Sequence, residues 1–447
     1  MKRLCLLVLA LAGCDRADKN AALAPEVGPA DGAPVEGAPE VGPLDAGSTE
    51  AGAPPIEDGR CRALNACPCP GPACDAPAPA YTPPVTVAPS AALPPEVESQ
   101  TAHNNLDVVW HDDRLFFAFR TAPSHFASPR TMLYVVSTAD QQTWRFEGSF
   151  AEGTDLREPR FLSFGGQLHL YYARLGTSPA AFEPGETRVA TWQGPGRFGE
   201  SRLAFGGGFI PWRFVVRDGV AWLSGYLGGE NIYRAEGDAL TVHLLHSADG
   251  LTWGSADETT EVLRGGVSET AIELLPDGRL VAVGRNEAGD AGGFGSRICT
   301  APAALGPDGR PAPWTCTDDA RKFDSPLLLV EGETVWLIAR RQVAHDGRYD
   351  LGDDDLSQAE RWARYQTEYW FSPKRCALWR VDPEARAVQH VFDFPTAGDT
   401  CFASAVPLGA HRWLVYDYTS PPEAPDVTWR QGQGGPTAIY RTTLTLP

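Results

Sequence analysis

The chain has 447 residues, a hydrophobic content of 43% and a formal net charge of −19. This length and composition allow one large domain, or two or three smaller ones, with a sizeable core. The excess of acidic residues argues against nucleic acid or an anionic membrane surface as a partner, because both are themselves negatively charged.

Residues 1–13 have the pattern of a bacterial export signal. Lys2 and Arg3 supply positive charge, and the apolar run 4–11 is too short to span a bilayer. The run ends in Leu-Ala-Gly-Cys at 11–14, which resembles the lipobox of lipoproteins. We expect cleavage before Cys14, lipidation of its thiol, and an exported, lipid-anchored protein on the periplasmic or cell-surface side. An ordinary secretory signal is the alternative.

Residues 14–96 are rich in Pro, Ala, Gly and acidic residues, which predicts a disordered tether. Four cysteines cluster within it, at Cys61, Cys67, Cys69 and Cys74. An even number of cysteines in an exported chain favours disulfides. Zinc is the alternative, although the Cys-Pro-Cys-Pro spacing is unlike that of a zinc knuckle.

Residues 97–447 repeat one pattern six times, in which an apolar strand meets a tight turn and then a second apolar strand. The six hairpins cover residues 106–119, 160–172, 213–223, 271–283, 327–339 and 403–416. Most are followed by further strand-like segments, so the repeat has a period of roughly 45–75 residues. The pattern predicts an all-β domain, a six-bladed β-propeller whose blades are four-stranded antiparallel sheets.

Two turns share a sequence motif whose residues have recognisable conformational roles. Residues 247–253 read Ser-Ala-Asp-Gly-Leu-Thr-Trp, and residues 137–144 read Ser-Thr-Ala-Asp-Gln-Gln-Thr-Trp. In the first turn, Asp249 can accept hydrogen bonds from nearby backbone N–H groups, Gly250 can adopt positive φ, and Trp253 can bury its ring. Both turns resemble the Asp-box of sialidases and related β-propellers, although the first is one residue shorter and the second lacks the glycine. Two ordinary hairpins are the alternative.

Further segments resemble bacterial sialidase-like glycosidase propellers, and the resemblance covers about residues 100–447. These segments are 119–125, 156–159, 269–271 with 275–280, 398–400 and 438–440. The resemblance implies hydrolysis of a glycan, with one group protonating the leaving oxygen and another attacking or activating water. It also implies arginines that grip a carboxylate, an acidic acid/base, and a tyrosine nucleophile assisted by a glutamate. The Arg-Ile-Pro motif of sialidases is absent.

Blade geometry predicts where the chemistry lies. The start of each first strand and the end of each second strand share one face of the ring, which we call the mouth, and the Asp-box turns lie on the opposite face. Glu269 is the expected catalytic carboxylate, with Glu158 or Asp399 as its partner, Asp324 in reserve, and Tyr418 matching the tyrosine by position. The expected substrate-binding residues are Arg120, His125, Arg157, Trp212, Arg213, Tyr226, Arg285 and Arg340. Salt bridges between blades are the alternative.

The remaining cysteines form two expected disulfides, Cys299 with Cys316 and Cys376 with Cys401, because exported chains favour them. Residues 342–374 interrupt the fifth unit and contain the one helix candidate, 356–370. Its aromatic residues recur at helical spacing, so one face is apolar. The insertion is expected to act as a lid on the mouth, although such a face more often packs on a blade.

These observations predict an exo-acting glycosidase outside the cytoplasm, monomeric and with no metal or cofactor. Its partners are a glycan and, through the lipid alone, a membrane. The alternative is a non-catalytic propeller that binds a glycan or a protein, since one fold can serve both purposes. Two carboxyl groups, or a tyrosine and a carboxylate, facing each other at about 5–9.5 Å would favour the enzyme.

Overall fold

The computed structural model describes residues 78–234 and 237–447. The predicted signal segment, the lipidation site Cys14, the cysteine cluster at 61–74 and most of the predicted tether therefore lie outside the described residues. Ala78–Pro447 forms one compact unit.

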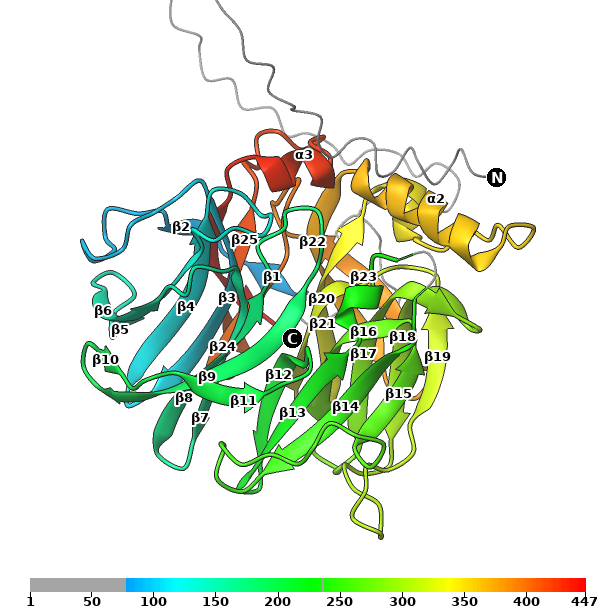
Figure 1. Cartoon of the computed structure of the whole chain (residues 1–447), viewed down its shortest axis with the longest axis horizontal. Coiled ribbons are helices and arrows are strands. Elements are labelled where there is room, and N and C mark those ends of the chain that lie inside the picture. Colours follow the sequence, from blue (N-terminus) through cyan, green and yellow to red (C-terminus); the bar gives the residue numbers. More distant parts are fainter. Residues whose placement is uncertain (1–77, 235–236) are drawn as a thin grey trace, which may run out of the picture. The chain divides into compact units, whose positions relative to one another are not determined.

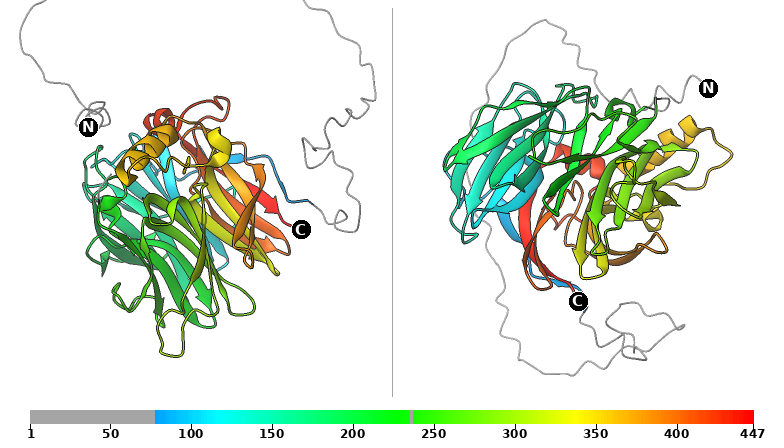
Figure 2. Two further views of the ribbon diagram at one scale, coloured as in Figure 1. Left: turned by 90° about the vertical axis from the view of Figure 1, so that its right-hand side faces the viewer. Right: turned by 90° about the horizontal axis from the view of Figure 1, so that it is seen from below.

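Six antiparallel sheets are arranged in a ring, which confirms the predicted six-bladed propeller (Figures 1 and 2). Blade 1 consists of β3 (Ala102–His111), β4 (Arg114–Ala122), β5 (Met132–Thr138) and β6 (Arg145–Phe150). Blade 2 consists of β7 (Leu156–Phe164), β8 (Gln167–Leu175), β9 (Pro184–Gly194), β10 (Arg197–Phe198) and β11 (Arg202–Phe205). Blade 3 consists of β12 (Ile210–Arg217), β13 (Val220–Leu227), β14 (Leu240–Ser247) and β15 (Glu261–Gly265).

Blade 4 consists of β16 (Val267–Leu274), β17 (Leu280–Asp290), β18 (Gly293–Ala301) and β19 (Thr315–Asp319). Blade 5 consists of β20 (Asp324–Glu331), β21 (Thr334–Gln342), β22 (Lys374–Asp382) and β23 (Ala387–Asp393). Blade 6 consists of β24 (Ser404–Gly409), β25 (Arg412–Thr419) and β26 (Ala438–Thr445), joined by β1 (Ala80–Tyr81) and β2 (Val85–Ala88). The first strand of each blade contacts that of a neighbouring blade, so these strands line the ring centre.

The ring is closed by residues that the sequence pattern assigns to the tether. β1 and β2 both pair antiparallel with β26, the last strand of the chain. The predicted boundary at residue 97 is therefore wrong, and ordered structure begins before it. The physical reason is that β26 would otherwise expose a row of unpaired backbone groups along its edge. The two strands are short and lie among prolines, which hides their strand pattern.

The two predicted turn motifs share one hydrogen-bond pattern. Asp249 Oδ1 accepts the backbone N–H groups of Leu251 (2.8 Å) and Thr252 (2.6 Å). Asp140 Oδ1 accepts those of Gln142 (2.8 Å) and Thr143 (2.7 Å) in the same way. Each carboxylate therefore satisfies backbone donors of its own tight turn, as the sequence predicts.

Both predicted disulfides are present. Cys299 and Cys316 join facing positions of β18 and β19. Cys376, on β22, is bonded to Cys401, which precedes β24, so this bridge joins blades 5 and 6. No helix among residues 78–234 and 237–447 is long and apolar enough to cross a membrane.

Two helices lie at the same end of the ring (Figures 1 and 2). The predicted helix is α2 (Gln358–Trp370), which begins with a capping box between Ser357 and Glu360. A second helix, α3 (Trp429–Gly434), is not predicted, because its glycines at 432 and 434 conceal it. Two short 3-10 turns are η2 (Gly229–Asn231) and η3 (Ala344–Gly347).

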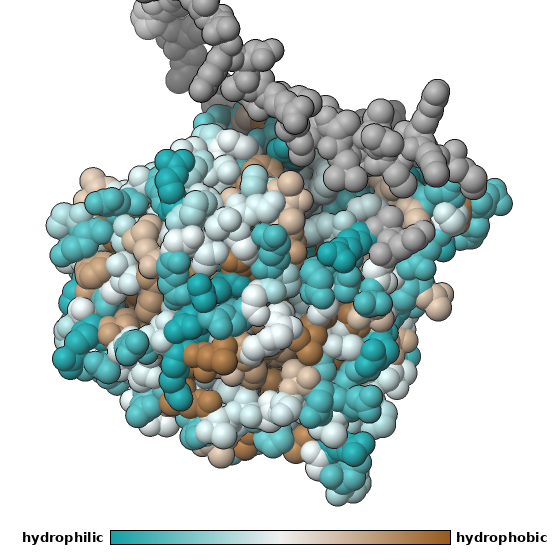
Figure 3. All heavy atoms as spheres, viewed as in Figure 1, coloured by the Kyte–Doolittle hydropathy of each residue, from teal (hydrophilic) through white to brown (hydrophobic). Residues whose placement is uncertain are grey.

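The exposed large apolar side chains are scattered over the chain, at Tyr81, Val85, Leu203, Val216, Tyr233, Val343 and Phe371. The face in Figure 3 likewise mixes hydrophilic side chains with small separate groups of hydrophobic ones. Tyr233, one member of this set, lies near Glu287, Arg285 and Glu269.

Candidate active site

Every blade has the same irregularity at the mouth end of its first strand. In blade 1 the pairing steps from Asn104–Arg120 to Leu106–Phe119, so Asn105 is an extra residue. The equivalent step lies between residues 157 and 160, 211 and 213, 267 and 270, and 324 and 327 in the next four blades. In blade 6 it lies between the bridge Thr400–Thr419 and the pair Ser404–Tyr416. Such β-bulges re-aim side chains and are common beside active sites.

Four of these bulges hold a non-glycine residue in the left-handed region. The φ angles are 40° at Asn105, 52° at Glu158, 51° at Ser325 and 74° at Cys401. Each such residue costs on the order of 1–3 kcal/mol, and strain of this kind clusters at functional sites. The mouth therefore contains strained backbone of the kind that clusters at functional sites.

Glu158 and Glu269 lie at the bulges of blades 2 and 4. Glu158 Oε1 accepts a hydrogen bond from Asn105 Nδ2 at 3.3 Å. Glu269 Oε2 accepts the backbone N–H of Ser325 at 2.8 Å, and its Oε1 lies 3.1 Å from Arg285 Nη1. Both carboxyl side chains are 11% exposed.

Burial raises the pKa of both glutamates. The pKa of Glu158 rises to about 7, because burial and the nearby charge of Glu269 outweigh the opposing effect of Arg160. Burial also raises the pKa of Glu269, against the effect of Arg285. The mouth thus holds two carboxyl groups with raised pKa values. The pKa of Glu158, which is influenced by the charge of Glu269, lies near neutral pH.

Asp324 lies at the centre of a cationic cluster. Its Oδ2 lies 3.1 Å from Arg340 Nη1 and 3.6 Å from Lys322 Nζ, and its Oδ1 lies 3.9 Å from Arg285 Nε. The hydroxyl of Tyr369, on α2, donates a hydrogen bond to the same carboxylate. Burial alone would raise the pKa of Asp324, but the three cations lower it to about 2.

Asp399 joins blade 6 to blade 1. Its Oδ2 lies 2.7 Å from His125 Nδ1, and its Oδ1 accepts hydrogen bonds from the Tyr418 hydroxyl (2.9 Å) and Trp429 Nε1 (3.1 Å). Asp399 and Tyr418 are both buried. Tyr418 therefore directs its hydroxyl at a buried carboxylate of its own blade, and Arg340 Nη2 lies 3.5 Å from the same hydroxyl.

Arg120 and Arg157 share one carboxylate, that of Asp155. Arg120 is fully buried and donates to Asp155, to Asn104 Oδ1 and to backbone carbonyls of the loop after β4. Arg157 Nε lies 2.5 Å from Asp155 Oδ2, and its side chain is 13% exposed. Of these two arginines, Arg157 is therefore the one accessible to a ligand.

Trp212 and Arg213 cross the ring centre and hold blades together. Arg213 donates to the carbonyl oxygens of Pro326 (3.1 Å) in blade 5 and Ala403 (3.0 Å) in blade 6. The indole of Trp212, which is fully buried, packs against the guanidinium of Arg160 at 4.8 Å. These two predicted ligand residues therefore make cross-ring contacts within the protein itself.

Two tyrosines of blade 3 border the glutamate pair. Tyr226, predicted from the sequence, is buried, and burial together with Glu269 raises its pKa well above the ordinary value. Tyr233, in the loop after η2, is not predicted. It is 38% exposed, its ring meets that of Phe182 edge-on at 6.2 Å, and its charge neighbours are Glu287, Arg285 and Glu269. Tyr233 therefore presents an aromatic surface beside the site.

The insertion packs on the ring through its apolar face. Trp362, Tyr365 and Tyr369 are buried, and Trp362 Nε1 donates to the carbonyl of Ile232 in blade 3. Tyr369 contacts the ammonium of Lys322 at 3.3 Å from the ring centroid. The helix thus covers charged groups of the mouth with its own side chains.

Contacts link the predicted residues from blade to blade. Glu269 contacts Arg285, which also lies near Asp324. Asp324 pairs with Arg340, which lies beside the Tyr418 hydroxyl, and that hydroxyl donates to Asp399. His125 continues the chain, and its carbonyl accepts a hydrogen bond from Arg157. Asp155, Arg160, Glu287, Lys322 and Tyr369 complete this network, although the sequence analysis does not assign them a role. Lys322 and Asp155 lie just before first strands, which is the positional signal that could have selected them.

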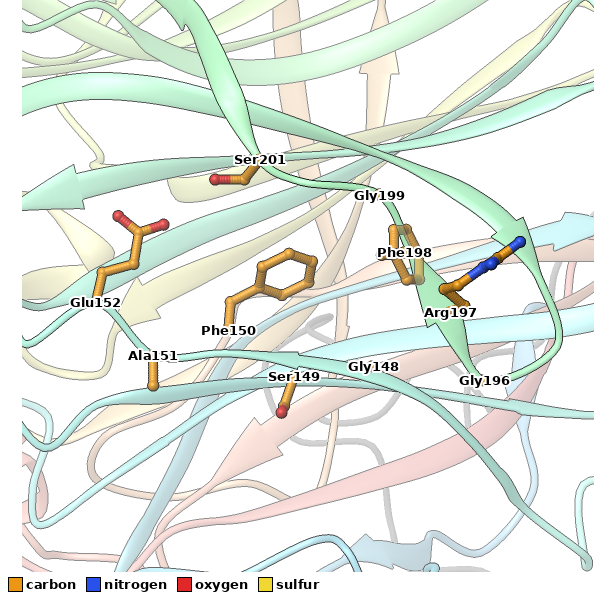
Figure 4. Close-up of a pocket in the computed structure, with 10 residues that line it drawn as sticks. All are labelled: Gly148, Ser149, Phe150, Ala151, Glu152, Gly196, Arg197, Phe198, Gly199 and Ser201. Carbon is orange, nitrogen blue, oxygen red and sulfur yellow. The ribbon is translucent and has the colours of Figure 1, made fainter.

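A separate surface pocket of about 380 Å³ lies between blades 1 and 2. Figure 4 shows Phe150, Phe198, Glu152 and Ser201 around it, with backbone of β6 and β10 between them. None of the predicted site residues lines it.

Neither a protein-family model nor a curated protein matches the sequence. The fold does match solved structures. A protein of unknown function from Dyadobacter fermentans has 15% identity and a TM-score of 0.55, over 83% of this chain and 100% of that chain. A Trypanosoma rangeli sialidase has 11% identity and a TM-score of 0.51, over 82% of this chain and 60% of that one. At these identities the likeness establishes a shared propeller fold, and the chain matches about 60% of the sialidase's length.

Proposed function

We propose that the protein hydrolyses a glycosidic bond at the mouth, with Glu158 and Glu269 as the two carboxyl groups. One observation carries this proposal. The side chains of Asp155, Glu287, Asp324 and Asp399 are at most 1% exposed, whereas those of Glu158 and Glu269 are each 11% exposed. The two glutamates are therefore the carboxyl groups of this network that a substrate can reach.

Their environments suit different roles. Glu158, with its pKa raised to about 7, retains a proton for transfer to the leaving oxygen as the glycosidic C–O bond breaks. Glu269 receives a backbone N–H and faces Arg285, contacts that oppose the rise in its pKa caused by burial. It either attacks the anomeric carbon or removes a proton from the attacking water. Asp399, Asp324 and Tyr418 act in this proposal by positioning neighbours.

The proposal includes an extracytoplasmic location with a lipid anchor at Cys14 and an exo mode of cleavage. Two disulfides in a chain of this size are typical of an oxidising compartment. The cross-ring contacts of Trp212 and Arg213 favour attack on a chain end, because they join blades 3, 5 and 6 across the ring centre.

A non-catalytic binding propeller is the second candidate. It is favoured by Arg120, Arg213 and Arg340, whose donors are engaged by the protein's own acceptors, as in a structural network. Such a protein would bind a glycan without cleaving it.

A panel of aryl glycosides tests the proposal on wild-type protein and on Glu158→Gln and Glu269→Gln. We expect each variant to lose a factor of roughly 10²–10⁴ in turnover. Glu273→Gln is the matched control, because Glu273 lies four residues further along the same strand and is a half-buried acid that also has a raised pKa. Equal turnover by all folded variants would contradict the assignment, and binding without turnover by the wild type would favour the second candidate.

A further inference from the structure

The cationic cluster of the mouth already holds an internal carboxylate. Asp324, 1% exposed, lies within 3.1–3.9 Å of Arg340, Lys322 and Arg285. Glu287 adds a second negative charge, at 3.2 Å from Arg285 Nη1 and 3.0 Å from Lys322 Nζ. Each of the three cations is therefore paired with at least one carboxylate of the protein itself.

The other cations of the mouth are engaged as well. Arg120 and Arg157 both pair with Asp155, and Arg213 donates to backbone carbonyls. Arg160 lies between the rings of Trp212 (4.8 Å) and Phe402 (4.4 Å) and 3.7 Å from Glu158. Within residues 78–234 and 237–447, each cation of this network thus has an acceptor or an aromatic partner.

The unmet hydrogen-bonding needs are mainly those of acceptors. Around the mouth, Asn105 Oδ1, Glu158 Oε2, Asn286 Oδ1 and Asp324 Oδ1 are buried acceptors without a hydrogen-bond partner among the described residues, and Glu287 Oε2 makes an ion pair with Arg285 but no hydrogen bond. Of the carboxyl groups among them, Glu158 is the one that a substrate can reach. Around the mouth, the donors without a partner in the described part of the chain are those of Arg160, which the two aromatic rings enclose, and Nε2 of Gln366 on α2. Unpaired buried acceptors are costly and are relieved by a donor. Sugar hydroxyls supply donors, whereas a carboxylate supplies only more acceptors.

We infer that the mouth takes an uncharged sugar, recognised through its hydroxyl groups, in preference to a sialic or uronic acid. This inference rests on the proposed function for its substrate class, and it depends on the carboxylates of Asp324 and Glu287 within the cationic cluster. A ligand carboxylate bound at Glu158 and Glu269 would add a negative charge to a site whose cations already pair with Asp324 and Glu287. Like charges repel strongly in such a buried setting.

Two pairs of aryl glycosides test the substrate class on the full-length protein, because the members of each pair differ only by oxidation at C6. The pairs are glucoside with glucuronide and galactoside with galacturonide, and an aryl sialoside is added. We expect the neutral member to be favoured at least tenfold in kcat/KM or, without turnover, in affinity. A preference for a uronide or for the sialoside would overturn the inference.

A second measurement tests the charge argument without any turnover. Asp324→Ala leaves Arg285, Lys322 and Arg340 without their shared carboxylate, so acetate should bind in its place and raise the melting temperature by about 2 °C at constant ionic strength. The wild type and Asp417→Ala should not respond, because the hydrogen-bond donors to Asp417, which include Phe402 N–H and the Tyr440 hydroxyl, are uncharged. No acetate response in Asp324→Ala would overturn the inference.

If Asp324→Ala does not fold, Asp324→Asn retains the side-chain volume and still removes the charge. It should bind glucuronate at least tenfold more tightly than the wild type does, and unchanged affinity would overturn the inference. If the wild type hydrolyses none of the glycosides but acetate stabilises Asp324→Ala, the proposed function is refuted and the role of Asp324 in the cationic cluster stands.

Discussion

The Asp399 carboxylate accepts from His125 at 2.7 Å and so ties blade 6 to the loop that follows β4 of blade 1. Both residues also belong to the network that surrounds the two glutamates. The contact therefore links the closure of the ring to the geometry of the mouth.

Asp399→Asn should lower stability at neutral pH. Burial alone would raise the pKa of Asp399, but His125 and Arg340 bring it below the ordinary value. A carboxyl group whose pKa is lower in the folded state stabilises the fold above its unfolded pKa, and this contribution is lost as the pH falls through the folded pKa. Denaturant unfolding should give a loss of about 3 kcal/mol at pH 7. The difference should shrink below about pH 4. The exposed control Glu423→Gln should be neutral, and a loss independent of pH would contradict the account.

Glu158→Gln should have the opposite pH dependence. A carboxyl group with a raised pKa stabilises the fold below its unfolded pKa, and this contribution is lost as the pH rises through the folded pKa of about 7. The uncharged glutamine should therefore make the protein more stable at pH 8, by roughly 1–2 kcal/mol, and change little near pH 5. Denaturation midpoints at the two pH values measure this effect. Lower stability of the variant at pH 8 would mean that Glu158 functions as a paired anion.

The activity of the wild type should fall as the pH rises above 7, because Glu158 then loses the proton that the leaving group needs. The pH profile of kcat/KM measures this limb. A profile that stays flat to pH 9 would remove Glu158 from the acid role while leaving Glu269 to be tested separately.

Tyr233→Ala should weaken binding without unfolding the ring. The tyrosine is 38% exposed beside the glutamate pair, so its ring can stack on a sugar. We expect KM to rise about tenfold with kcat nearly unchanged, and Tyr233→Phe to retain most of the affinity. Leu203→Ala is the control for loss of an exposed apolar side chain, because Leu203 is 56% exposed on β11 in blade 2. An unchanged KM would exclude Tyr233 from the site.

A chain that starts at residue 97 should be less stable than one that starts at residue 78. The shorter chain lacks β1 and β2, which pair with β26, and so exposes the edge of blade 6. Thermal unfolding should show a midpoint lower by several degrees and an increased tendency to associate. Equal midpoints would mean that the last blade is stable with three strands.

The sequence predicted the repeated hairpins because their turns are rich in Asp and Gly, residues with a direct conformational role. It also indicated the positions of Glu158, Glu269 and Asp399, because strand order alone determines which residues reach the mouth. The bulges could not be predicted, since one extra residue leaves the apolar pattern on either side intact. The partners of Arg120 and Arg340 could not be predicted either, because they come from segments distant along the chain or from backbone carbonyls. Tyr233 lies in a loop, where neither strand alternation nor turn chemistry selects it.

The bulge recurs at one place in all six blades, which has a consequence for how such a protein can diversify. Each extra residue is flanked by regular strand pairing, so its side chain can be exchanged with limited effect on the neighbouring ladder. Four of these positions can then vary on one scaffold, as the loops of an antibody do on theirs. The other two are Trp212, which packs across the ring centre, and Cys401, which forms a disulfide. Random libraries confined to residues 105, 158, 269 and 325 would therefore search new ligand specificities while sparing most of the fold.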